Sequence, residues 1–100
     1  MEILSEHTVT WTEQPWGRSA QVADKSTWQE VAGQQSFGPD KLASGKELIT
    51  VTLAGGAQVR LAERVLRPLA GQMFLREAGE ELEVVNDTLL PLRLLRVQVS

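Results

Sequence analysis

The sequence predicts a single all-β domain, folded as a sandwich or barrel of short strands. Its 100 residues suit one domain with one hydrophobic core. Short runs of apolar and polar residues recur along the chain, separated by Gly, Pro, Asn and Asp, as in many-stranded β proteins. No long helical pattern is present: the best candidate, residues 62–66, is followed at once by Arg67-Pro68, which blocks a helix from continuing.

The expected strands follow one another at short intervals. In chain order they are residues 7–12, 18–23, 27–31, 47–53, 57–61, 65–66, 73–75, 82–85 and 92–99. Turns are expected at residues 14–17, 38–40, 55–56, 77–79 and 86–88, where Gly, Pro, Asn and Asp gather. Residues 32–46 are rich in small and polar side chains and are expected to form a long loop of the kind that often carries function.

The strand at 47–53 has a clear alternation that separates two faces. Ile49, Val51 and Leu53 share one face, and Thr50 and Thr52 share the other. One face therefore belongs to the core, and the other looks onto solvent or the lumen of a pocket.

The C-terminal strand, residues 92–99, is apolar on both faces. Its apolar residues divide into Leu95, Val97 and Val99 on one face and Leu92 and Leu94 on the other. One small barrel cannot bury both faces, and an uncovered face or sheet edge promotes association. We therefore expect a homodimer, although the long stems of Arg93 and Arg96 could instead shield a monomer.

Composition excludes several classes of function. The net charge is −3 with both signs interspersed, so no basic patch favours nucleic acid as a partner. Cysteine is absent, which excludes disulfides, thiolate nucleophiles and cysteine metal sites. No secretory signal pattern and no apolar run of membrane-spanning length is present, so we expect no membrane partner and a cytoplasmic location.

A glycine-containing motif covers residues 71–86, which read GQMFLREAGEELEVVN. Gly71, Gly79 and Asn86 match the spacing of the second cupin motif, G-x5-P-x-G-x2-H-x3-N, while Glu77 stands at its proline position and Leu82 at its histidine position. On these residues the chain resembles the cupin superfamily, which implies a jelly-roll barrel, also called a double-stranded β-helix. The two glycines are expected to allow tight turns, and Asn86 to hold the turn that follows strand 82–85.

The resemblance runs from Glu47 to the C-terminus and carries no metal ligands with it. In the first cupin motif a glutamate ligand precedes a glycine at fixed spacing. Counting back from Gly55 leads to Leu48, with Glu47 one residue earlier, and counting back from Gly56 leads to Ile49. The upstream histidines of that motif would fall within residues 41–46, which contain none. We therefore expect no metal and no other cofactor.

Within the superfamily, the chain looks most similar to the cupin domain of type II mannose-6-phosphate isomerases and their fused guanylyltransferases. An R-P-W-G near the start of that family is echoed by residues 14–17, QPWG, and its closing P-L-x-L-I-E-V-Q by residues 91–98, PLRLLRVQ. The metal-holding histidines and glutamate of that family have no counterparts here, so the resemblance does not imply its isomerase activity.

The candidate ligand site is the barrel interior at the usual cupin metal position. The residues expected to line it are Glu47, Leu48, Thr50, Met73, Leu82 and Trp28, with Phe74 as the alternative to Met73. Glu47 has two interpretations. It could accept a hydrogen bond from a ligand hydroxyl in the barrel mouth, or it could simply end the strand on the face of Ile49.

Other polar and aromatic residues suggest chemistry less strongly. The single histidine, His7, could act as a general base in a cleft, but a surface or rim position is the preferred interpretation. The acids at positions 77, 80, 81 and 83 could form a catalytic carboxylate pair, yet a solvated turn explains them better. Trp16 is expected to pack over the barrel end, and a ligand role for any of the three tryptophans is left open.

Three functions remain open. The first is a metal-free protein that binds a small carbohydrate or organic acid. The second is a metal-independent isomerase or epimerase that uses Glu47 or His7 as base, and the third is an interaction or regulatory protein with a packed barrel. The barrel interior discriminates among them: an open apolar cavity favours the first, a cavity with a buried carboxylate the second, and a filled barrel the third.

Overall fold

The computed structural model describes residues 4–53 and 56–99, and these residues form strands and turns without any helix. The strands are β1 (Thr12–Gln14), β2 (Gly17–Ala23), β3 (Ser26–Val31), β4 (Ser36–Lys41), β5 (Lys46–Leu53), β6 (Gln58–Leu61), β7 (Arg64–Leu66), β8 (Met73–Glu77), β9 (Glu81–Val85) and β10 (Leu92–Gln98). Within the described ranges, no helix is therefore long and apolar enough to cross a membrane. The all-β prediction is confirmed.

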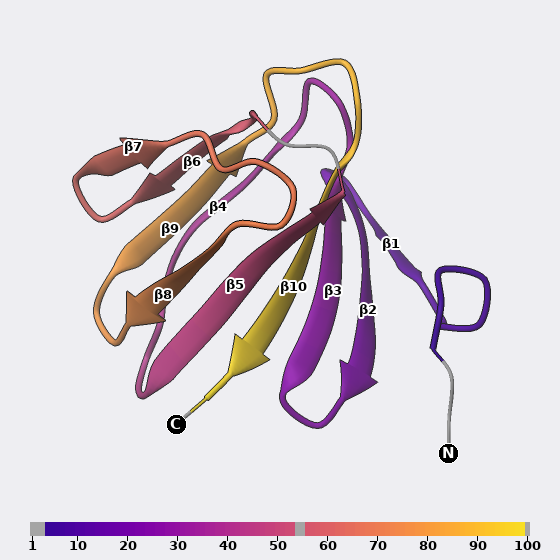
Figure 1. Ribbon diagram of the computed structural model, residues 1–100, viewed down its shortest axis with the longest axis horizontal. Coiled ribbons are helices and arrows are strands. Elements are labelled where there is room, and N and C mark those ends of the chain that lie inside the picture. Colours follow the sequence, from indigo (N-terminus) through magenta and orange to yellow (C-terminus); the bar gives the residue numbers. More distant parts are fainter. Residues whose placement is uncertain (1–3, 54–55, 100) are drawn as a thin grey trace.

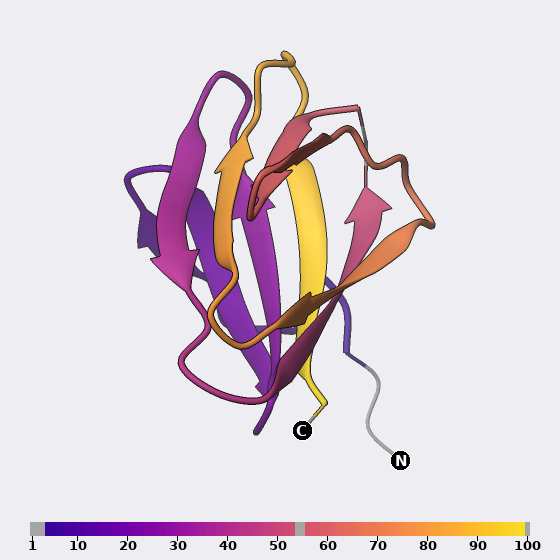
Figure 2. The same ribbon diagram turned by 90° about the vertical axis from the view of Figure 1, so that its left-hand side faces the viewer.

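The strands form two antiparallel sheets that face each other. The larger sheet has six strands in the order β1-β2-β3-β10-β5-β8, and the smaller has four in the order β4-β9-β6-β7 (Figure 1). In the side view of Figure 2 the smaller sheet lies in front of the larger one. Strands distant in sequence are therefore neighbours in space, as in a jelly-roll barrel.

The core lies between the sheets and is aliphatic. The larger sheet contributes Val31, Ile49, Val51, Leu92 and Leu94, and the smaller contributes Val59, Leu61, Leu82 and Val84, each at most 6% exposed. Within each strand these residues are two apart, as the pleat of a strand requires. Burying one such leucine or isoleucine contributes about 1.5–3 kcal/mol. A register slip of one residue would expose the whole row, so the apolar pattern determines which side chains face inward.

The turn residues of the motif behave as expected. Gly71 and Gly79 have φ angles of 91° and 87°, in the left-handed region that glycine adopts without steric cost. The short helical candidate at 62–66 is a hairpin turn at residues 62–63 followed by β7, because Ala62 has a φ of 54° and Leu61 pairs with Arg64. Both glycine predictions are confirmed.

Asn86 anchors the connection that follows β9. It is only 1% exposed. Its Nδ2 donates to the carbonyl oxygens of Val31, Ala32 and Leu90 at 3.0, 3.2 and 2.8 Å. Its Oδ1 accepts hydrogen bonds from the backbone N–H and the hydroxyl of Thr88. The side chain thus replaces the backbone partners that the turn lacks, which confirms the role predicted for it.

One strand prediction, near the N-terminus, and one loop prediction, residues 32–46, are corrected. Residues 6–8 form a turn, because the backbone N–H of Thr8 donates to the Ser5 carbonyl at 3.0 Å and the Thr8 hydroxyl accepts from the Ser5 N–H at 2.8 Å. The expected loop 32–46 contains β4, an edge strand paired with β9. Its register shifts between Phe37 and Asp40, and the intervening Gly-Pro is compatible with an edge strand but resembles a loop in sequence.

Of the two alternatives that the sequence left open for the C-terminal strand, an uncovered edge or an uncovered face, the position of β10 excludes the edge. β10 lies between β3 and β5 inside the larger sheet, so both of its edges are hydrogen-bonded. Leu92 and Leu94 face the core, whereas Leu95 and Val97 are half-buried on the outer face. An apolar outer face remains as the reason to expect a homodimer, which stays a prediction.

Candidate functional site

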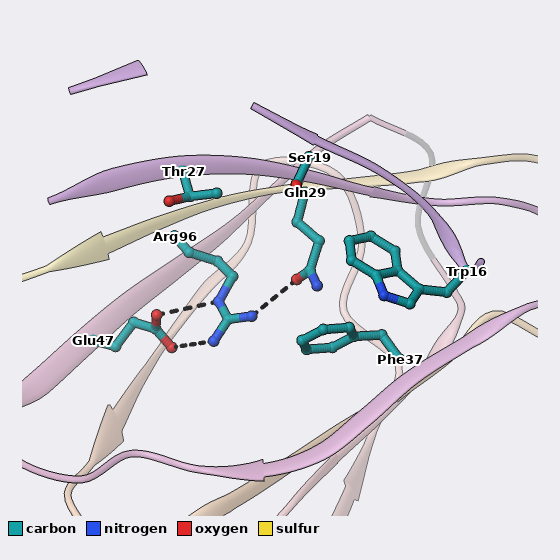
Figure 3. A pocket seen from close by; sticks show the side chains of 7 residues that line it. All are labelled: Trp16, Ser19, Thr27, Gln29, Phe37, Glu47 and Arg96. Atoms are coloured by element: carbon teal, nitrogen blue, oxygen red, sulfur yellow. Dashed lines mark hydrogen bonds and ion pairs between the residues drawn. The ribbon is translucent and has the colours of Figure 1, made fainter. Parts of the chain in front are cut away.

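A cavity of about 290 Å³ opens beside the aliphatic core. Its lining residues come from both sheets and are Trp16, Ser19, Thr27, Gln29, Phe37, Glu47 and Arg96 (Figure 3). Small-molecule sites usually begin at about 300 Å³. The cavity therefore suits a ligand of roughly monosaccharide size.

Three strands of the larger sheet supply the polar wall by continuing their buried rows. Glu47 stands two residues before Ile49 on β5, Gln29 two before Val31 on β3, and Arg96 two after Leu94 on β10. Because side chains alternate along a strand, each polar residue shares the inward face of its apolar neighbour. The rows change from aliphatic to polar where the cavity opens.

Arg96 and Glu47 form a two-point ion pair between β10 and β5. Nε of Arg96 donates to Oε2 of Glu47 at 3.2 Å, and Nη2 donates to Oε1 at 3.0 Å. Arg76 Nη1 also donates to Oε1 of Glu47 at 3.3 Å. Both side chains of the Arg96–Glu47 pair are 13% exposed. The Glu47 carboxylate is thus held by two guanidiniums in the fork geometry that strengthens such pairs.

Arg76 fixes this pair from behind. It is 0% exposed, its Nε donates to the Glu80 carbonyl at 3.0 Å, and its Nη2 donates to the Asp40 carbonyl. Its Nη1 also lies 3.7 Å from Oδ2 of Asp40. Arg76 therefore joins β8, β4, β5 and the turn before β9. Oδ1 of Asp40 is a buried acceptor without a hydrogen-bond donor among the described residues.

The orientation of Gln29 follows from its contact with Arg96. Nη1 of Arg96 donates to Oε1 of Gln29 at 3.1 Å. A guanidinium has donors only, so the amide oxygen must face it. The amide nitrogen then points away from Arg96, towards the side of the cavity occupied by Trp16 and Phe37 (Figure 3). Gln29 thereby presents an N–H donor to whatever enters.

Two aromatic rings form the apolar wall. Trp16, in the turn before β2, meets Phe37 of β4 edge-to-face, with ring centroids 4.8 Å apart and planes at 71°. Arg96 also lies over Phe37, with its guanidinium carbon 5.6 Å from the ring centroid. Both rings pack against the core. The cavity thus combines an apolar side with a hydrogen-bonding side.

The residues at the usual cupin metal position do not fit a metal ion. Leu82, at the motif histidine position, and Ile49, one of the two glutamate alternatives, are both 0% exposed within the core. Leu48, the other alternative, alternates with Ile49 and faces outward. Glu47 lines the cavity, but its carboxylate oxygens accept hydrogen bonds from guanidiniums instead of being free to bind a metal ion. Among the described residues, no three His, Cys, Asp or Glu side chains converge as ligands would.

The structure places two of the six expected interior residues inside the barrel, though at different positions, and the other four outside. Glu47 lines the cavity and Leu82 fills the core. The other four lie on the outer face of the larger sheet: Leu48, Thr50, Met73 and Trp28. Their register partners are one another or the outward-facing Leu95 and Val97, and not the buried rows. Met73 is 59% exposed and borders a second, more open cavity between β7 and β8. These four residues therefore do not line the barrel interior.

His7 and the acidic turn also lie away from the cavity. The His7 side chain is 86% exposed, and its Nε2 is 3.8 Å from Oε1 of Glu6. In the acidic turn, Glu80 Oε1 accepts the backbone N–H of Glu77 at 2.7 Å, and Glu83 pairs with Arg60 at 3.0 Å. Neither group forms a catalytic pair in the barrel interior, as the preferred interpretations of the sequence anticipated.

Trp28 belongs to a separate cluster on the outer face. It stacks against Trp11, with ring centroids 6.1 Å apart, and Arg18 and Arg93 lie over the Trp11 ring. Glu30 accepts hydrogen bonds from both arginines. Burial opposes ionisation of Glu30, but the hydrogen bonds from Arg18 and Arg93 outweigh it and hold its pKa below the ordinary value. This cluster anchors the N-terminal segment to the sheet.

Sequence reasoning missed most of the polar wall, although one signal was available. Arg96 falls on the Leu92 and Leu94 face of its strand, and Gln29 on the Val31 face, yet both resemble surface residues by type. Arg76 similarly follows the parity of Phe74 on β8. Strict alternation, applied to polar as well as apolar residues, would have found all three.

Solved structures resemble this one closely, whereas no family model and no curated protein matches the sequence. The cupin domain of Drosophila melanogaster CENP-C is similar at a TM-score of 0.78 and 11% identity, covering 97% of this chain and 80% of that one. The polyketide cyclase RemF from Streptomyces resistomycificus gives 0.77 and 19%, covering 98% and 78%. A predicted oxalate decarboxylase from Thermotoga maritima gives 0.79 and 12%, covering 98% and 100%. At these identities the likeness is one of fold, and the protein therefore has the cupin fold.

Proposed function

We propose that this protein binds a small organic molecule, of the carbohydrate or small organic acid class, in the barrel cavity and without a metal ion. The observation that carries the proposal is the inward-facing polar wall of Glu47, Arg96 and Gln29 beside the rings of Trp16 and Phe37. A few directed polar groups in a partly aromatic cavity are typical of ligand sites. Two fold neighbours are named for enzymes that act on small organic molecules, a polyketide cyclase and a predicted oxalate decarboxylase.

The energetics of the wall support a binding role. Placing charged groups inside a barrel has a desolvation cost, and a buried ion pair is often no more stabilising than apolar residues of similar volume. The aliphatic rows of β5 and β10 could have continued through positions 47 and 96, where they instead carry an ion pair. The Arg96 guanidinium and the buried Gln29 amide line the cavity, where a ligand could complete their hydrogen bonds.

A metal-independent isomerase or epimerase is the second candidate, because a carboxylate does line the cavity. As a base, however, Glu47 would need a free oxygen near the substrate, and both of its oxygens accept guanidinium N–H groups. His7 is exposed and lies outside the cavity. Binding is therefore favoured over catalysis, and the open cavity also argues against a fully packed interaction barrel.

The proposal is tested by NMR titration of the ¹⁵N-labelled protein with a library of monosaccharides and small carboxylic acids. Binding in the cavity should shift the Trp16 indole, the Gln29 side-chain amide and Arg96 Nε, and leave the Trp11 and Trp28 indoles unmoved. Arg96→Met should weaken binding at least tenfold, about 1.4 kcal/mol.

Arg93→Met is the matched control for this titration. Arg93 lies on the same strand, has the same 13% exposure and pairs with Glu30 on the outer face. Its replacement should leave binding unchanged. Equal losses in the two variants, or shifts confined to the outer face, would refute the proposed site.

A further inference from the structure

We infer that the cavity selects a neutral, hydroxyl-rich ligand over the corresponding carboxylate, and that Glu47 sets this preference. The inference rests on the proposed function, because it names the ligand class of the same cavity. Three features of the wall carry it: the balance of charge, the mixture of donors and acceptors, and the shape of the apolar side.

The charges at the base of the cavity balance. Glu47 and Asp40 are carboxylates, and Arg76 and Arg96 are guanidiniums, all joined within 3.9 Å of a neighbour. Nε and Nη2 of Arg96 are already bound to Glu47. An anionic ligand at Arg96 would therefore lie beside the Glu47 carboxylate, where like charges repel. A cationic ligand would meet the Arg96 guanidinium that lines the cavity, so a neutral ligand is the one that encounters no opposing charge.

The hydrogen-bonding groups require a partner that both donates and accepts. Glu47 can only accept, Arg96 and the Gln29 amide nitrogen can only donate, and the hydroxyls of Ser19 and Thr27 can do both. A carboxylate only accepts, so it could add no hydrogen bond to Glu47 beyond the three that its oxygens already accept from guanidinium N–H groups. A ligand hydroxyl can donate to Glu47 and accept from Arg96 or Gln29. Several adjacent hydroxyls can therefore form hydrogen bonds along the whole polar wall.

The apolar side completes the match. Trp16 and Phe37 present ring surface opposite the polar wall, in a cavity of about 290 Å³. The C–H face of a sugar ring can cover such aromatic surface, while its hydroxyls point to Gln29 and Arg96. A monosaccharide is of a size that suits this volume.

Removing the charge of Glu47 should reverse the preference. In Glu47→Gln the two guanidiniums face Asp40 alone, and the base of the cavity becomes positive. One carboxylate oxygen becomes an amide NH₂ group, so at least one donor of Arg96 is released and can bind the carboxylate of an acid. The substitution keeps the size of the side chain and changes one charge. The variant should therefore gain affinity for acids and lose it for neutral sugars.

The test uses three matched pairs of probes that differ at one carbon: D-glucose and D-glucuronate, D-mannose and D-mannuronate, D-galactose and D-galacturonate. NMR titrations followed at the Trp16 indole and the Gln29 amide yield the affinity ratio within each pair. Wild type should bind at least one neutral sugar about tenfold more tightly than its acid, and Glu47→Gln should lower that ratio at least tenfold. Glu30→Gln is the control, because Glu30 is also 13% exposed and paired with two arginines, but on the outer face. It should leave the ratio unchanged.

Each outcome decides a separate point. Tighter binding of the acids by wild type overturns the ligand class but leaves small-molecule binding intact. A ratio unaltered in Glu47→Gln overturns the role of Glu47. Absence of cavity shifts from all six probes also overturns the ligand class, and the wider library then decides the proposed function independently. If Glu47→Gln fails to fold, the wild-type ratio decides the ligand class without it.

Discussion

Replacing Leu82 by aspartate tests whether the usual metal position is filled core. Leu82 is 0% exposed and packs within the aliphatic cluster. The substitution forfeits about 1.5–3 kcal/mol of apolar burial and places an unpaired carboxyl in the interior at a cost of several kcal/mol. We expect a loss of about 5 kcal/mol or more, against a free energy of unfolding of about 5–15 kcal/mol for a typical domain. The variant should therefore lose at least a third of the stability of a typical domain, and all of it if wild type lies at the lower end of that range.

Chemical and thermal denaturation followed by circular dichroism measure this loss. A loss of about 5 kcal/mol corresponds to a drop in Tm of roughly 20 °C or more for a domain of this size. Leu89→Asp is the matched control, because Leu89 is 86% exposed, and it should melt close to wild type. Burial favours the neutral form of the introduced carboxyl, so the deficit of Leu82→Asp should shrink as the pH falls. If Leu82→Asp melts within a few degrees of Leu89→Asp, position 82 lines open solvent and the filled-site account is wrong.

Three further predictions concern metal content, pH dependence and association. Elemental analysis of dialysed protein should show no stoichiometric transition metal, and one retained equivalent of Fe, Mn, Ni or Zn would contradict this. The Leu82→His variant should not bind metal either, because the other ligands of a metal site are missing. The Glu30 ion pairs should make wild type more stable than Glu30→Gln at pH values above the ordinary Glu pKa of 4.5, and this advantage should disappear as the pH falls through the lowered pKa of Glu30 in the folded state. A difference in unfolding free energy that does not change with pH would refute the pairing. Sedimentation at micromolar concentration should give a homodimer formed through the apolar outer face of β5, β8 and β10, whereas a mass near 11.0 kDa would exclude it.

The fold was predictable because its determinants are local. Alternation identified most strands, and the left-handed glycines and Asn86 lie where the motif spacing indicated. The prediction of a strand at residues 7–12 was wrong near its start, because hydrogen bonds between Ser5 and Thr8 stabilise a turn that competes with extended structure. β4 was not predicted, because an edge strand with a register shift has the residue types of a loop.

The candidate site was predictable only in part, because it depends on the pairing of distant strands. Glu47 was chosen from the motif, and its strand parity places it inside. Its partner Arg96 lies on β10, which sits beside β5 only after the chain has crossed between sheets. Trp28 and Met73 were expected inside, whereas register with Leu95 and Thr50 places them outside. The position of a residue in the alternation of its strand predicted which way its side chain faces better than its residue type did.

A crystal structure of the protein bound to the tightest ligand from the titrations, grown after treatment with a chelator, tests the central claim most directly. The account predicts ligand density between the Trp16–Phe37 rings and the polar wall, with ligand oxygens within hydrogen-bond distance of Gln29 Nε2 and Arg96. It also predicts that the Arg96–Glu47 pair stays intact and that no metal ion lies near Leu82. Ligand bound on the outer face or between β7 and β8, or coordinated through a metal inside the barrel, would contradict it.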